Sequence, residues 1–91
     1  MIVARRFIVK GRVQGVGYRY FAIRAAAECD VTGYVRNLPD GSVEAVAEGH
    51  AKAIERFKHE LARGPSFARI LNIVEADIPL TGGYTRFDVT Y

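Results

Sequence analysis

The sequence has little cysteine and no long apolar segment, and each shortage excludes a class of protein. Its one cysteine, Cys29, cannot form an internal disulfide bond, and neither His50 nor His59 stands near it at metal-ligand spacing. We therefore expect a cytoplasmic protein without a metal site, in which Cys29 is a small buried apolar residue. No apolar run approaches the roughly 20 residues of a membrane-spanning helix, and the first residues lack the apolar core of a secretory signal.

Acidic residues are absent from positions 1–27, although this segment carries six basic side chains. The rest of the chain holds seven basic and ten acidic residues, so +6 and −3 give the net charge of +3. The first third of the chain is therefore strongly positive, although the net charge of the whole chain is modest. Such a field concentrates anionic ligands, which could be small anions or nucleic acid.

The length and composition are those of one small globular protein. Ninety-one residues, 49% of them hydrophobic and 25% charged, can form a single core but not two. We expect one domain over residues 1–91, acting as a monomer and without a membrane partner.

Apolar periodicity and turn signals predict five strands and two helices. The strands are expected at about 3–13, 31–38, 42–49, 68–78 and 84–91, and the helices at about 19–29 and 50–63. This order is the ferredoxin-like βαββαβ plan of the α+β class, with an extra C-terminal strand. Two helices would cover one face of an antiparallel sheet of strand order 4-1-3-2. The last strand can be assigned only to an edge or an extension.

The facing of the predicted strand 68–78 is ambiguous. Ile70 and Val74 alternate against Leu71 and Ile73, so either set could point toward the core. On the predicted strand 42–49, Glu44 and Glu48 share one face, and we expect both to be exposed to solvent.

Residues 9–19 run from an apolar strand through a glycine-rich loop into a helix that is expected to begin at Arg19. Amide groups at a helix N-terminus lack intrahelical partners, and glycines let the backbone approach an anion closely. Arg19 in the first helical turn is disfavoured by the helix dipole by roughly a few tenths of a kcal/mol or more. A bound phosphate would accept hydrogen bonds from the loop amides and would also neutralise the charge of Arg19. An ordinary strand-to-helix turn with a solvated arginine is the alternative, and both interpretations stay open.

Asn37 is a polar residue where the pattern calls for an apolar one. It shares a strand face with Val31, Gly33 and Val35, at the end next to the predicted hairpin turn. A buried side-chain amide without partners would cost about 1–3 kcal/mol. Asn37 either caps its own turn or holds a water molecule or substrate oxygen, and the pattern alone favours the cap.

Two long blocks of the sequence resemble signatures of the acylphosphatase family, whose members hydrolyse carboxyl-phosphate bonds. The blocks are GRVQGVGYR at 11–19 and GYVRNLPDGSV at 33–43, and a later segment, GPSFARI at 64–70, also resembles the family. The resemblance covers essentially the whole chain, and the family fold agrees with the plan above. One departure is Tyr18, where phenylalanine is commoner; its added hydroxyl should not disturb the loop if it reaches solvent.

The resemblance implies a catalytic arginine at Arg19 and a catalytic asparagine at Asn37, with a small acyl phosphate as substrate. The phosphate would be held by Arg19 and by the backbone amides of Gln14, Gly15, Val16, Gly17, Tyr18 and Arg19, while Asn37 orients the attacking water. No Asp, Glu, His or Cys stands near the loop to act as base or nucleophile. The water proton would pass to a phosphate oxygen of the substrate, and we expect no metal or other cofactor.

Three other functions are alternatives to this one. A nucleic-acid module of this fold would stack bases on sheet aromatics, but residues 42–49 contain none, so we expect no nucleic-acid partner. A non-catalytic anion-binding domain would not need both Arg19 and Asn37. A related domain serving carbamoyl phosphate inside a larger protein is the third alternative.

Several other polar residues are expected to have no direct part in the chemistry. His50 and His59 should be solvated, and Arg5, Arg6 and Arg36 should add to the positive field without touching substrate. Arg12 lies nearer the loop and is the one further candidate for a direct role.

Overall fold

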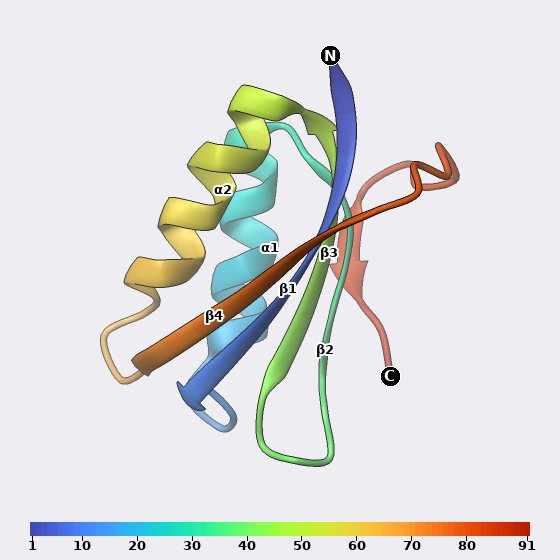
Figure 1. Ribbon diagram of the computed structural model, residues 1–91. Helices are drawn as coiled ribbons and strands as arrows, with labels where there is room; N and C mark the ends of the chain where they lie inside the picture. Colours follow the sequence, from blue (N-terminus) through green and yellow to red (C-terminus); the bar gives the residue numbers. More distant parts are fainter.

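The computed structural model describes residues 1–91, and it contains all seven predicted elements (Figure 1). They are β1 (Ile2–Arg12), α1 (Tyr18–Cys29), β2 (Thr32–Asn37), β3 (Val43–His50), α2 (Ala51–Arg63), β4 (Arg69–Ile78) and β5 (Phe87–Val89). The ferredoxin-like α+β plan is confirmed. The last strand is much shorter than the predicted 84–91. Neither helix has the length and apolar character needed to cross a membrane.

The five strands form one sheet in the order β4-β1-β3-β2-β5, so the predicted order 4-1-3-2 is confirmed and β5 lies at the edge beside β2. The sheet is mixed rather than wholly antiparallel, because β5 pairs parallel to β2, with Gly33 opposite Phe87. The end of β4 and the start of β5 lie at the same end of the sheet. β5 therefore runs opposite to β4 and parallel to β2.

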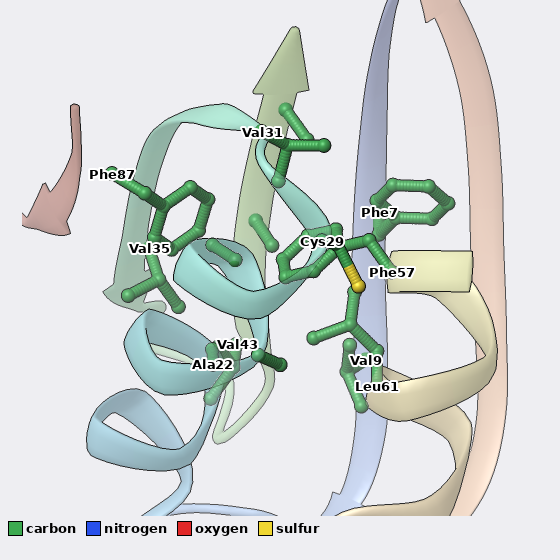
Figure 2. Close-up of a cluster of buried hydrophobic side chains, with 14 of the residues drawn as sticks. Phe7, Val9, Ala22, Cys29, Val31, Val35, Val43, Phe57, Leu61 and Phe87 are labelled. Carbon is green, nitrogen blue, oxygen red and sulfur yellow. The ribbon is translucent and has the colours of Figure 1, made fainter. Parts of the chain in front are cut away.

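Both helices pack on the same face of the sheet (Figure 1), and the core lies between them and the strands. Figure 2 shows Phe7 and Val9 of β1 and Val35 of β2 in this layer, with Cys29 of α1 and Phe57 of α2. The side chains come from strand residues of one face and from one stripe of each helix. Cys29 is buried as expected, and burial raises the pKa of its thiol.

A β-bulge resolves the facing of β4. Lys10 pairs with Asn72 and Gly11 with Ile70, so one residue of β4, Leu71, has no partner on β1. An extra residue shifts the alternation by one position. Ile70 and Ile73 therefore both pack against the core, while Leu71 is 71% exposed.

Glu44 and Glu48 of β3 are buried, so the prediction that they face solvent was wrong. β3 is the central strand, and the connection from β4 to β5 must pass from one edge of the sheet to the other. Thr81 on this connection donates to the Glu48 carboxylate from its amide (3.0 Å) and its hydroxyl (2.8 Å), and the Gly82 amide also donates (3.0 Å). Burial opposes the ionisation of Glu48, but these hydrogen bonds outweigh it and lower the pKa of its carboxyl.

The arginines expected to add to the positive field are neutralised by nearby carboxylates. Glu44 accepts hydrogen bonds from Arg6 (2.5 Å) and Arg36 (2.6 Å), and despite burial these contacts lower the pKa of Glu44. Arg5 forms ion pairs with three carboxylates, those of Glu55, Glu75 and Asp77. The unpaired positive charge of the first third is consequently restricted to residues nearer the glycine-rich loop. His50 and His59 are exposed, as expected.

Candidate active site

A pocket of about 310 Å³ lies where the glycine-rich loop, the start of α1, the end of β2 and the last residues of the chain meet. It brings Arg19 and Asn37 together, although they belong to different elements. Its lining consists of Val13, Gly15, Gly17, Tyr18, Arg19, Tyr20, Ile23, Asn37, Val89 and Tyr91.

The loop before α1 leaves a run of backbone amides without protein partners. Gly15 (φ 73°) and Gly17 (φ 78°) have left-handed backbone conformations, which side-chain-bearing residues rarely adopt. Gly17 caps α1 without any side-chain hydrogen bond, and the first amide to find a partner is that of Phe21, which donates to the Gly17 carbonyl (3.0 Å). The amides of residues 14–20 donate to no protein atom, so they are available to a ligand.

Arg19 lies in the first turn of α1, half-buried, with no carboxylate at ion-pair distance. Its guanidinium carbon is 5.9 Å from the centre of the Tyr91 ring. The first turn of α1 contains no acidic residue. The positive end of the helix dipole and the Arg19 charge therefore lie side by side without a compensating anion.

Asn37 is the last residue of β2, and its Oδ1 atom is buried without a hydrogen-bond partner. The neighbouring turn is closed by other groups. The Leu38 amide donates to the Ser42 carbonyl (2.8 Å), and the Ser42 amide donates to the Asp40 carboxylate (2.9 Å). The Asn37 side chain takes no part in closing the turn, which removes the capping interpretation.

Gln14 and Val16 of the predicted amide loop do not line the pocket. Val16 packs against the core. The side-chain amide of Gln14 donates to the carbonyls of Leu38 (2.8 Å) and Ser42 (2.9 Å), and so ties the loop to the turn that follows Asn37. No local sequence pattern indicates this contact, because it joins segments that are remote along the chain.

The Tyr18 hydroxyl does not reach solvent, so the condition under which it would leave the loop undisturbed is not met. Tyr18 is fully buried, and its hydroxyl donates to the carbonyl of Leu61 in the last turn of α2 (2.8 Å). The helical partner of that carbonyl would be the amide of residue 65, which is a proline and has no N–H. The Tyr18 hydroxyl thus donates to the Leu61 carbonyl the hydrogen bond that Pro65, which has no N–H, cannot donate. Burial raises the pKa of its phenol.

Five lining residues were not predicted from the sequence: Val13, Tyr20, Ile23, Val89 and Tyr91. Phe87, Val89 and Tyr91 alternate along the predicted strand 84–91, which places all three on one face but does not show what that face meets. Arg12 is exposed and does not line the pocket. The lining contains no carboxylate, imidazole or thiol, the usual bases, nucleophiles and metal ligands.

Comparison with known proteins agrees with this geometry. The sequence pattern of the acylphosphatase family matches residues 5–89. An acylphosphatase of Thermus thermophilus is 59% identical over 63 residues, which are 69% of this chain and 72% of that protein. The crystal structure of acylphosphatase from Bacillus subtilis superposes with a TM-score of 0.93 at 37% identity, covering 100% of both chains.

The chain is also similar to part of a larger protein. Full-length HypF, in its phosphate- and nucleotide-bound form, matches with a TM-score of 0.88 at 29% identity, covering 100% of this chain and 12% of HypF. In the Bacillus subtilis acylphosphatase, by contrast, the match covers 100% of that protein's chain as well. This chain belongs to the acylphosphatase family, a family of hydrolases.

Proposed function

We propose that this protein hydrolyses acyl phosphates to a carboxylate and inorganic phosphate, with Arg19 and the loop amides holding the phosphate and Asn37 orienting the attacking water. The observation that carries this proposal is the shared pocket. It joins an arginine without an ion pair, a helix N-terminus with free amides and a buried asparagine oxygen without a partner.

The phosphoryl group would lie at the N-terminus of α1. The backbone amides of residues 14–19, which donate to no protein atom, would direct their partial positive charge at the bound anion, and the helix dipole would add to it. The planar guanidinium of Arg19 can donate to two phosphate oxygens at once. These donors would stabilise the charge that the three phosphoryl oxygens carry during transfer.

Asn37 would position the attacking water molecule. Its Oδ1 atom can accept a hydrogen bond from a water molecule, and a buried acceptor of this kind costs about 1–3 kcal/mol while it stays unsatisfied. The water oxygen attacks phosphorus, its proton passes to a phosphate oxygen of the substrate, and the bond between phosphorus and the carboxylate oxygen breaks. The leaving group keeps the electron pair as a carboxylate.

The lining of the pocket favours acyl phosphates over phosphomonoesters. An alkoxide leaves poorly without a general acid, whereas a carboxylate leaves readily, and the pocket contains no carboxyl or imidazole group to act as that acid. The reaction then depends on positioning and on charge stabilisation. Every group assigned a role belongs to one copy of the chain, which is consistent with a monomer acting on a small molecule.

The test compares hydrolysis of benzoyl phosphate with that of glycerol phosphate, and then examines Asn37→Ala. We expect benzoyl phosphate alone to be hydrolysed. In Asn37→Ala, turnover should fall by about 10²-fold or more, because one positioned polar group is lost from the reacting centre. Competitive inhibition by inorganic phosphate should change little, because the loop and Arg19 remain.

Asp40→Ala is the matched control, because it weakens the same turn without touching the pocket. It should lower the melting temperature and keep turnover near that of the unchanged protein. An Asn37→Ala protein that is destabilised yet fully active would remove Asn37 from the mechanism.

A further inference from the structure

Two arginines of the sheet lie directly opposite each other. Arg12 is the last residue of β1 and pairs with Arg69, the first residue of β4. Directly paired residues of antiparallel strands point to the same face of the sheet, with their Cβ atoms on the order of 5 Å apart. Both side chains are exposed, and neither forms an ion pair. Like charges at opposite positions destabilise a sheet, so this pair does not serve the stability of the fold.

The other arginines of the strands all have carboxylate partners. Arg5 forms ion pairs with three carboxylates, and Arg6 and Arg36 share the carboxylate of Glu44. Arginines without a partner are therefore confined to one end of the sheet, where β1 leads into the glycine-rich loop and β4 begins.

The β-bulge in β4 brings these two arginines to the same face. Without the extra residue Leu71, Arg12 would lie opposite Ile70, and Arg69 would point to the core side of the sheet together with Ile73. The bulge shifts the alternation by one position and turns Arg69 to the face that carries no helices. Bulges that redirect a side chain in this way are common beside functional sites.

Gly11, the residue before Arg12, permits the close approach of the two strands at the bulge. Its φ of 136° is rarely adopted by residues with a side chain. A Cβ atom at this position would also collide with the carbonyl oxygen of Arg69. The backbone geometry that pairs the two arginines therefore depends on a glycine at this point.

Lys10 adds a third cation near this pair. It lies two residues before Arg12 on β1, so its side chain points to the same face, and it forms no ion pair. Asp40 of the β2–β3 turn is close enough for Lys10 to act on it. Hydrogen bonds from Ser42, and to a smaller extent the charge of Lys10, lower the pKa of the Asp40 carboxyl. One carboxylate beside three cations leaves this end of the face positive.

We infer that Arg12 and Arg69, with Lys10 beside them, form a second anion site that binds one tetrahedral oxyanion with two negative charges, such as phosphate. Each guanidinium can donate to two oxygens of such an anion. Three cations fit a single small anion better than an extended polyanion, which Asp40 would repel. The site lies on the face of the sheet away from the helices (Figure 1), and none of its residues lines the pocket. It is therefore independent of the function proposed above.

The test titrates the isotopically labelled full chain with inorganic phosphate at slightly alkaline pH, where phosphate is mostly a dianion. Two-dimensional NMR follows the backbone amide and side-chain Nε–H signals of Arg12 and Arg69. We expect these signals to shift together and to saturate with one dissociation constant. In Arg69→Gln, the constant measured from the Arg12 signals should rise by at least about tenfold, because one of the two guanidinium groups is lost. Arg12→Gln, followed at Arg69, replaces this variant if it does not fold.

Arg56→Gln is the control for net charge, because Arg56 is an exposed α2 residue without an ion pair. It should leave the constant within about twofold of its original value. Shifts that do not saturate, or an equal weakening in Arg56→Gln and Arg69→Gln, overturn the second site, because the general positive field then explains them.

Arg19→Ala separates the second site from the pocket. It should leave the phosphate response of Arg12 and Arg69 unchanged, and loss of that response overturns the second site, because the shifts would then be transmitted from the pocket. Failure of the proposed function has a different signature, since phosphate would then leave the signals of Gly15 and Gly17 unchanged in the protein without substitutions.

Discussion

The side-chain amide of Gln14 donates a hydrogen bond of 2.8 Å to the carbonyl oxygen of Leu38, the residue that follows Asn37. The same nitrogen also donates to the Ser42 carbonyl across the turn. No other side chain forms a hydrogen bond between the loop before α1 and the β2–β3 hairpin. Arg19 and the loop amides lie on one side of the pocket and Asn37 on the hairpin side, and Gln14 connects the loop to the hairpin.

Gln14→Met should therefore lower turnover more than it lowers binding. Methionine keeps the length of the side chain but cannot donate, so the hairpin can shift relative to the loop. We expect the free energy of unfolding to fall by about 1 kcal/mol and kcat to fall by about tenfold. Inhibition by inorganic phosphate should stay within a factor of about two of its original value, because the phosphate contacts lie on the loop side. Steady-state kinetics and thermal unfolding measure both, and a loss of stability with unchanged kcat would limit Gln14 to a structural role.

Arg19→Ala should lose most phosphate binding and most activity, and Arg19→Lys should restore little of either. Lysine keeps the charge but lacks the planar group that donates to two oxygens. The fold should survive, because Arg19 has no ion pair to lose and a cation near a helix N-terminus is unfavourable. Calorimetric titration with inorganic phosphate measures the binding.

Arg24→Ala is the comparison for Arg19, since it removes another α1 arginine that lies outside the pocket and has no ion pair. It should bind inorganic phosphate as before. Equal losses in the two alanine variants would mean that the general positive field, rather than Arg19, holds the phosphate.

Tyr18→Phe should lower the free energy of unfolding by about 1–2 kcal/mol, because the carbonyl of Leu61 then has no partner in a buried place. Pro65 prevents the helix itself from supplying one. Urea or thermal unfolding measures the change. Tyr84→Phe removes a hydroxyl that makes no hydrogen bond to the protein and should have little effect, and similar losses in both variants would contradict this account.

Glu48→Gln should destabilise the protein at neutral pH and much less in acid. The pKa of Glu48 is lower in the folded than in the unfolded chain, so its ionised form stabilises the fold at a pH above the unfolded value of about 4.3. This contribution is lost as the pH falls through the lower folded pKa. We expect a loss of about 1–3 kcal/mol at pH 7 that shrinks toward pH 3.

Unfolding of Glu48→Gln measured across this pH range tests the prediction. Glu55→Gln serves as its control, because Glu55 is exposed and its ion pair with Arg5 should contribute little. A loss at Glu48→Gln that stays constant with pH would show that ionisation of Glu48 is not what stabilises the connection between β4 and β5.

The order and type of the elements and the strand order β4-β1-β3-β2 could be predicted from the sequence alone. The elements follow from periods of two or 3.6 residues and from turn chemistry, which are local properties, and the strand order follows from the βαββαβ plan that this order of elements matches. The approach of Arg19 to Asn37 was expected from the two sequence blocks, and the pocket contains both residues.

Features that depend on contacts between distant segments could not be predicted from local patterns and are seen in the folded chain. The direction of β5 follows from where the chain crosses the sheet, and that crossing buries Glu48 under Thr81. Leu71 is left unpaired by a bulge that β1 imposes on β4, and the Tyr18 hydroxyl is taken up by a carbonyl that Pro65 leaves free. A local pattern indicates which residues are apolar. It does not indicate which group will pair with each polar or unpaired group, because that partner comes from a distant segment of the chain.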